Sequence, residues 1–192
     1  MTGQLGAERT ELGERTLLAQ VARGDRAAFE RLYREYHPRL LHFLTRMLAS
    51  RTAAEEALND TMLVVWRRAE SFNGSSKVST WIFGIAYRSA LKALRQSDPP
   101  VEIADPEALV ADEAPGPETT LIARQEAVAL RDLLITLPAD QRSVVELTYF
   151  HDFSYREIAE VLACPVDTVK TRMFHARRKL RSWIEAQKER SA

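Results

Sequence analysis

Apolar residues recur at intervals of three and four along most of the chain, the spacing that places them on one face of an α-helix. Residues 17–22 begin such a pattern, and Gly24 ends it in the manner of a helix C-cap. Asp25 can cap the next helix, whose apolar stripe continues past Pro38 to Leu48. No segment of useful length alternates apolar and polar residues as a strand does. The pattern therefore predicts an all-α fold.

Two further helices are predicted in the first half of the chain. A capping box at residues 52–55 opens a helix that reaches residue 69. The turn residues of 72–77 predict a loop, after which Ser79 or Thr80 caps a helix that ends near residue 95. This last helix is apolar on most of its sides, which is typical of a helix packed in a core.

The most specific pattern lies in residues 154–181, which predict two helices joined by a tight turn. Ser154 and Glu157 form a capping box for the first helix. Ala163 holds the turn position that usually requires a positive φ, and Pro165 cannot continue the first helix. Two helices with this connection match a helix-turn-helix, whose second helix enters the major groove of DNA.

Charge and proline content divide the chain into two small helical domains. The 27 basic and 27 acidic residues balance overall, but residues 67–95 and 165–190 are strongly basic. Residues 97–118 hold five of the eight prolines, seven acidic residues and no basic one, which predicts an extended acidic linker. The expected organisation is a tail without fixed structure (1–13), a first domain (14–96), the linker (97–118) and a second domain (119–187) with helices over 118–137 and 141–150.

Composition excludes several classes of protein. The single cysteine, Cys164, cannot form an intrachain disulfide, which suits a reducing cytoplasm. The N-terminus has no apolar signal segment, and no stretch approaches the roughly 20 apolar residues of a membrane span. We find no phosphate-binding glycine loop, nucleophile elbow or paired metal ligands, so we expect no enzyme activity, cofactor or metal. Cys164, His151 and His175 lack the spacing of a zinc site.

Three sets of surface residues are candidates for binding. A polar stripe on the helix over 52–69 is either an ordinary wet surface or a docking face, and it comprises Glu56, Asn59, Asp60 and Leu63. A basic line with an aromatic residue at one end suits single-stranded nucleic acid or is simply solvated, and it comprises Trp81, Arg88, Lys92 and Arg95. The second helix of the helix-turn-helix carries six basic residues: Lys170, Arg172, Arg177, Arg178, Lys179 and Arg181.

Four segments in this order resemble the extracytoplasmic-function sigma factors of bacteria. Residues 29–41 are similar to the first helix of that family, and residues 54–66 to its polymerase-binding segment. Residues 79–95 are similar to the segment that recognises and opens the minus-ten promoter element. Residues 137–142 together with 154–181 are similar to the reader of the minus-thirty-five element. The resemblance extends from about Leu17 to Trp183.

The resemblance implies a cytoplasmic protein that binds the β′ clamp helices and the β flap of core RNA polymerase. It also implies binding of promoter DNA, both as duplex and as melted non-template strand. A third implied partner is an anti-sigma factor. Core polymerase would be bound by Glu56, Asn59, Asp60 and Leu63. The minus-ten element, with one base flipped out, would be bound by Asn73, Lys77, Trp81, Tyr87, Arg88 and Lys92. The minus-thirty-five duplex would be bound by Thr168, Lys170, Thr171, Arg172, Phe174, His175 and Arg178.

The alternative is a two-domain helix-turn-helix regulator that binds duplex DNA without polymerase. Such a regulator needs neither an aromatic and basic helix for melted DNA nor a separate docking face. The first domain therefore favours the sigma factor.

Overall fold

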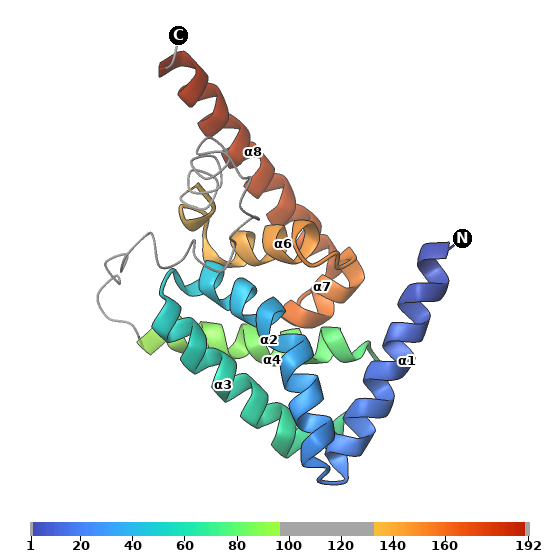
Figure 1. The fold of residues 1–192 in the computed structure, drawn as a ribbon. Helices are drawn as coiled ribbons and strands as arrows, with labels where there is room; N and C mark the ends of the chain where they lie inside the picture. Colours follow the sequence, from blue (N-terminus) through green and yellow to red (C-terminus); the bar gives the residue numbers. More distant parts are fainter. Residues whose placement is uncertain (1, 97–132, 191–192) are drawn as a thin grey trace, which may run out of the picture.

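Every element of the structure, a computed structural model, is a helix (Figure 1). The backbone is described for residues 2–96 and 133–190, and the side chains for residues 11–96 and 133–186. The all-α prediction is confirmed, and no strand occurs in these ranges. The predicted linker over 97–118 and most of the helix predicted over 118–137 lie outside the described residues.

Four helices and a short 3-10 turn form the N-terminal module. Its elements are α1 (Thr2–Ala22), α2 (Arg26–Leu48), α3 (Arg51–Arg68), η1 (Ala69–Ser71) and α4 (Val78–Gln96). Asp25 caps α2 as predicted, because its carboxylate accepts hydrogen bonds from the N–H groups of Ala27 and Ala28 at 2.9 and 3.0 Å. Gly24, at φ +83°, ends the preceding helix. Pro38 lies inside α2, which continues past it to Leu48.

Three helix starts differ from the prediction, and two of them involve contacts between α1 and the segment at the start of α4. The cap of α3 is Ser50, whose hydroxyl accepts from the N–H of Ala53, and not Thr52. Helix α4 begins at Val78, so Ser79 and Thr80 lie within its first turn. Residues 2–13 belong to α1, where no fixed structure was predicted. The end of that segment is held by contacts with the loop before α4.

The C-terminal module consists of α6 (Ala139–Tyr149), α7 (Tyr155–Leu162) and α8 (Val166–Arg190). The first half of α8 packs on α6 and α7 through Val169, Met173 and Ala176, which are buried. Its second half extends away from the body of the molecule (Figure 1). In the part of the chain that the structure describes, no helix has both the length and the apolar character needed to cross a membrane.

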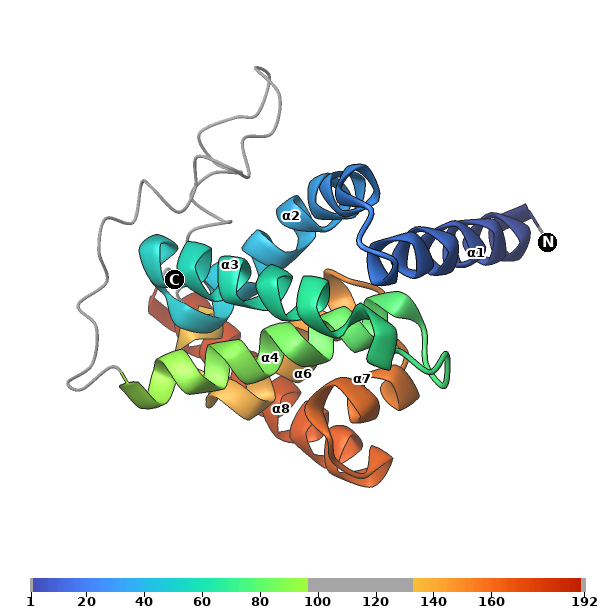
Figure 2. The ribbon, with the colours of Figure 1, turned by 90° about the horizontal axis from the view of Figure 1, so that it is seen from below.

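The two modules pack directly against each other. Helix α7 lies on α4, and α6 lies on the end of α2 (Figure 2). Buried apolar residues of both modules form one continuous cluster, which extends from Leu17 in α1 to Ala176 in α8. The packing of α7 on α4 brings the helix-turn-helix onto the helix that carries the predicted minus-ten residues.

Candidate nucleic-acid interface

The helix-turn-helix has the local geometry that its sequence predicts. Ser154 and Glu157 form the full capping box: the Ser154 hydroxyl accepts from the N–H of Glu157, and the Glu157 carboxylate accepts from the N–H of Ser154. Ala163 adopts the left-handed conformation at φ 50°, and its N–H caps the end of α7. Helix α8 then starts at Val166, directly after Pro165. The turn that usually requires glycine is formed here with alanine.

The predicted minus-thirty-five residues lie along the first half of α8. Lys170, Thr171, Phe174, His175 and Arg178 are exposed. Phe174, the one large apolar residue of this set, is 62% exposed. An exposed aromatic among basic residues suits contact with a base edge or a thymine methyl group.

Two members of the minus-thirty-five set form ion pairs within the protein. Arg172 is half-buried, and its Nε lies 3.0 Å from the Asp140 carboxylate of α6. Lys170 lies 2.9 Å from Asp167, one turn earlier on α8. These ion pairs leave Phe174, His175 and Arg178 as the more available exposed groups for DNA.

The predicted minus-ten residues are split between the surface and the module boundary. Arg88 and Lys92 are exposed on α4, and Asn73 is exposed in the loop before it. Trp81 is half-buried, with its ring 5.6 Å from that of Phe72. Tyr87 has only 7% of its surface exposed and lies beneath the C-terminal module. Most of the basic line therefore faces solvent, whereas Tyr87 does not.

The predicted polymerase-docking residues Glu56, Asn59, Asp60 and Leu63 are all exposed on α3. Leu63 is 45% exposed, although the apolar neighbours Met62 and Val65 are buried. The Asp60 carboxylate lies 3.9 Å from the ammonium group of Lys92 on α4. The docking face and the basic line thus lie side by side.

Aromatic rings fill the boundary between the modules. The Phe83 ring of α4 lies 5.1 Å from Phe153 and 4.8 Å from His151, both in the loop between α6 and α7. Phe43 of α2 lies behind them, 6.0 Å from His151. Gly84 brings α4 close to α7, since a Cβ added there would lie only 3.8 Å from the Cα of Val161. The boundary is an apolar interface with close backbone approach.

A buried arginine joins α6 to the end of α2. Nη1 of Arg142 donates to the carbonyl oxygens of Arg46 and Met47 at 3.0 and 2.9 Å, and Nη2 donates to those of Ile135 and Leu137 at 3.0 and 3.1 Å. The last carbonyls of a helix have no partner within it and carry the negative end of its dipole. The guanidinium therefore serves as a C-terminal cap for α2 from the other module.

A buried acidic residue accompanies this arginine. The Glu146 carboxylate has no exposed surface and lies 3.4 Å from Nη1 of Arg46 and 3.9 Å from Nε2 of His42. Burial lowers the pKa of Arg142, and the charge of Glu146 opposes that effect. A fully buried carboxylate requires such cations, because an isolated buried charge is very costly.

The boundary involves three of the predicted DNA-binding residues. Tyr87 is buried there, close enough to Ser143 and Arg172 for both to affect its pKa, which burial raises. Nζ of Lys77 lies 2.6 Å from the Glu157 carboxylate of α7. The hydrogen bond to Glu157 raises the pKa of Lys77. The structure thus places residues predicted for the minus-ten and minus-thirty-five elements against each other.

Acidification is expected to weaken this boundary through His151. Burial and the charges of His42, Arg39 and Arg46 lower the pKa of His151 from 6.5 to about 3. The unfolded chain binds more protons between these values, so the stabilisation present above pH 6.5 is lost as the pH falls towards 3. We expect a loss of about 2 kcal/mol of unfolding free energy between pH 7.5 and 5.0 from this group.

Urea unfolding at the two pH values measures this loss. In His151→Phe the pH dependence should be smaller than in the unaltered protein by that amount. The control His175→Phe makes the same change at an imidazole that is exposed on α8. Equal pH dependence in His151→Phe and the unaltered protein would show that His151 does not titrate in this way.

The residues that join the modules were not identified from the sequence. Arg142 and Glu146 stand four residues apart around the apolar Val144 and Val145, a spacing that indicates an ion pair on one helix face. Nothing in the sequence indicates that the partner of Glu146 is Arg46, 100 residues earlier. His42 of α2 also lies at this boundary, with its ring 5.6 Å from that of His151.

Comparison with known proteins identifies the class. Residues 32–99 match the family model of sigma-70 region 2, and residues 127–180 match that of sigma-70 region 4. The chain is therefore a sigma factor of the sigma-70 class, which binds RNA polymerase and recognises promoters. Together the two regions include all the predicted site residues.

Relatives identify the family. The chain is 36% identical over 174 residues to the ECF RNA polymerase sigma factor SigM of Mycobacterium tuberculosis, covering 90% of this chain and 85% of SigM. It is 33% identical to the ECF sigma factor RpoE of Cereibacter sphaeroides, covering 82% and 86%. The chain belongs to the extracytoplasmic-function sigma factors, and the alternative of a regulator without polymerase is not favoured.

Solved structures show the same fold. CnrH in complex with the cytosolic domain of CnrY matches with a TM-score of 0.68 at 24% identity, over 90% of this chain and 97% of that chain. The sigma factor RpoE from Bartonella quintana, in complex with the anti-sigma factor NepR, matches with a TM-score of 0.63 at 23% identity, over 82% and 96%.

Proposed function

We propose that three helices of this sigma factor each bind a different target. The exposed face of α3 docks on the β′ clamp helices of core polymerase. Helix α4 and the loop before it take the melted minus-ten strand, and α8 binds the minus-thirty-five duplex. The observation that carries this division is that the exposed residues of the three sets lie on α3, on α4 with the loop before it, and on α8, with the docking face beside the basic line. A regulator that binds duplex DNA alone needs only the α8 face.

We further infer that the packed arrangement of the modules does not bind the minus-ten strand. Tyr87 is covered by the C-terminal module, and Lys77 is paired with Glu157. Both residues become available when α7 separates from α4. The C-terminal module would bind the β flap of core polymerase while α3 binds the β′ clamp helices. Binding of core polymerase at both places would supply the free energy for that separation.

An anti-sigma factor is the third partner in this proposal. The Bartonella quintana relative in fold is bound to the anti-sigma factor NepR. On this chain, an apolar groove between α6 and α8 suits a partner helix. It is lined by Leu134, Val145, Leu180 and Ile184, with Arg177 and Arg181 beside them. A protein bound there and on α3 would favour the packed arrangement over polymerase binding.

The decisive experiment is transcription of fragmented genomic DNA by core polymerase with and without this protein, followed by mapping of the transcript start sites. We expect a set of starts that depends on the protein and shares two sequence elements upstream. The absence of any such start would overturn the proposal.

Docking through α3 is tested with Leu63→Lys. A lysine at this apolar position places a charge in the centre of the proposed contact, and we expect about tenfold weaker binding to core polymerase. Fluorescence anisotropy of the labelled sigma factor titrated with core polymerase measures the affinity. The matched control is Leu12→Lys, the same change at a leucine of α1 that is 68% exposed. Equal affinity of Leu63→Lys and Leu12→Lys would place the docking face elsewhere.

A further inference from the structure

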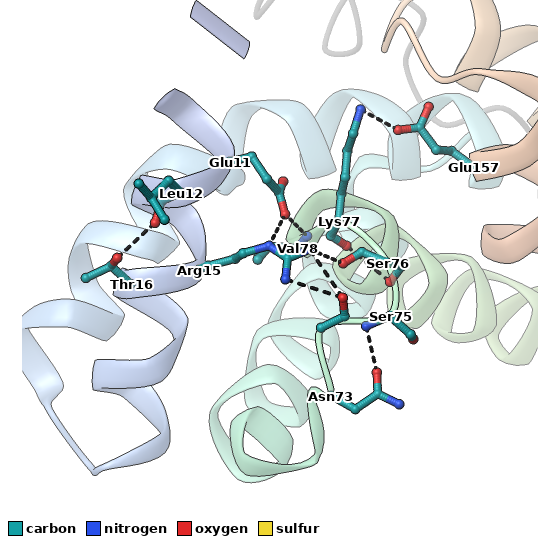
Figure 3. A network of polar contacts seen from close by, with 11 residues as sticks. Glu11, Leu12, Arg15, Thr16, Asn73, Ser75, Ser76, Lys77, Val78 and Glu157 are labelled. Carbon is teal, nitrogen blue, oxygen red and sulfur yellow. Dashed lines mark hydrogen bonds and ion pairs between the residues drawn. The ribbon is translucent and has the colours of Figure 1, made fainter. Parts of the chain in front are cut away.

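Helix α1 contacts the loop that precedes α4 through the side chain of Arg15 (Figure 3). Its Nη2 donates to the carbonyl oxygen of Ser76 at 3.0 Å, and both Nη1 and Nη2 lie 3.3 Å from the carbonyl oxygen of Gly74. The guanidinium carbon also lies 5.7 Å from the centre of the Phe72 ring. One planar cation thus holds two carbonyl groups and one ring of the same loop, which suits the fixed fork of arginine.

Glu11 orients this guanidinium and joins it to the start of α4. Its Oε1 accepts from Nε of Arg15 at 2.8 Å and from the N–H of Val78 at 3.3 Å. Val78 is the first residue of α4, where N–H groups have no partner within the helix and favour a negative charge. A carboxylate from α1 therefore takes the capping role that the sequence assigned to Ser79 or Thr80.

The backbone of the loop is also fixed from within. Gly74 has φ +74°, a conformation that residues with a side chain rarely adopt. A Cβ at Gly74 would lie 2.9 Å from Nη1 of Arg15, so the guanidinium occupies the space beside it. The side-chain oxygen of Asn73 accepts from the N–H of Ser75 at 3.0 Å, as in an Asx turn. The loop shape and the position of Arg15 require each other.

We propose that Arg15, oriented by Glu11, is a positioning residue for promoter recognition: it holds the loop of residues 73–77 in the shape that receives one minus-ten base. This inference rests on the proposed role of that loop. Arg15 acts through the two carbonyl groups that it binds, and Asn73 and Lys77 make the DNA contacts. A loop that is ordered before binding does not lose conformational freedom when the base arrives, so the base is bound more tightly.

The contact with α1 is independent of the packing between the modules. Figure 3 shows Lys77 extending from the loop towards Glu157 of α7, whereas Arg15 approaches from α1. Separation of the modules removes the ion pair of Lys77 and keeps every contact of Arg15. The loop would therefore hold its shape in the arrangement that binds DNA, with Lys77 released for the strand.

The test uses holoenzyme assembled from core polymerase and the full chain. The probe is a fork-junction DNA with a single-stranded minus-ten non-template strand, taken from a promoter mapped as described above. Each minus-ten base is replaced in turn by an abasic site, and the loss of affinity is measured. In the unaltered protein we expect about tenfold loss at the base that the loop holds, the usual effect of losing one stacked base.

Arg15→Gln should reduce that loss to below about threefold at this one position and leave the other positions as they are. Gly74→Ala should give the same profile, because it strains the loop and displaces the guanidinium. Arg15→Lys keeps the positive charge but not the planar fork of the guanidinium. Its loss of affinity at this position should lie between that of Arg15→Gln and that of the unaltered protein. Arg23→Gln, the same change at an exposed arginine beyond the end of α1, should match the unaltered protein.

Two results with Arg15→Gln would overturn the inference. One is an abasic profile identical to that of the unaltered protein. The other is an equal loss of affinity at every position, which is the result of a merely structural role. Failure of the proposed function looks different, because the unaltered holoenzyme itself would then show no protein-dependent start, or no minus-ten position sensitive to base removal.

Discussion

Arg142→Ala is expected to lower the free energy of unfolding by about 3 kcal/mol, the usual effect of removing one partner from a buried charged network. The guanidinium of Arg142 binds four backbone carbonyl groups, and alanine leaves them without a donor in a site that has little access to water. The Glu146 carboxylate also loses one of its nearby cations. Urea denaturation at pH 7.5 measures the change.

The control for this variant is Arg156→Ala, which removes an exposed arginine from α7. It should change the free energy of unfolding by less than about 0.5 kcal/mol, as is usual for surface substitutions. Arg142→Lys should retain part of the stability, since a single ammonium group cannot reach four carbonyls as the fork does. A loss below 1 kcal/mol in Arg142→Ala would show that water replaces the guanidinium at these carbonyls.

Gly84→Leu is expected to separate the modules. An alanine Cβ fits at this position, where the nearest backbone atoms of α7 are the Val161 oxygen and Cα at 3.7 and 3.8 Å. The further carbons of leucine have no space unless α7 moves away from α4. Overpacking of this kind costs about 2 kcal/mol, which here falls on the contact between the modules.

Small-angle X-ray scattering of the free protein measures this separation. Gly84→Leu should increase the radius of gyration, and Gly84→Ala, which adds only the Cβ that fits, should leave it unchanged. Far-ultraviolet circular dichroism should show the same helix content in both variants, because the substitution acts between helices. An unchanged scattering curve for Gly84→Leu would mean that the modules absorb the leucine without separating.

Local patterns in the sequence were sufficient for the helix-turn-helix and for most of the other helices, although not for the first residues of α1. Ser154 and Glu157 form the predicted capping box, Asp25 caps α2, and Ala163 takes the positive φ of its turn. Each of these features depends on residues within a few positions of one another. Local spacing determines such geometry, so a single sequence is enough to predict it.

Contacts between distant segments could not be predicted. Tyr87 was predicted to bind the minus-ten strand, and only the packing of the C-terminal module shows that it is buried. The capping group of α4 is Glu11, which lies 67 residues before Val78 and in a segment predicted to lack structure. The sequence of residues 1–13 is polar, and α1 is held at Glu11 and Arg15 by contacts with the loop and the start of α4.

The contact of Arg142 with the end of α2 forms late during synthesis of the chain. Arg142 follows Gln96, the last residue of α4, by 46 residues, and a ribosome adds about 5 to 20 residues each second. The N-terminal module is therefore complete for roughly 2 to 9 s before the residue that caps α2 has been made. During this interval no C-terminal module covers Tyr87, and a nascent chain presents its α4 face to any partner that is near the ribosome. Because the C-terminal module is synthesised last, each new molecule passes through a period in which the packed arrangement of the modules cannot form and α4 is not covered.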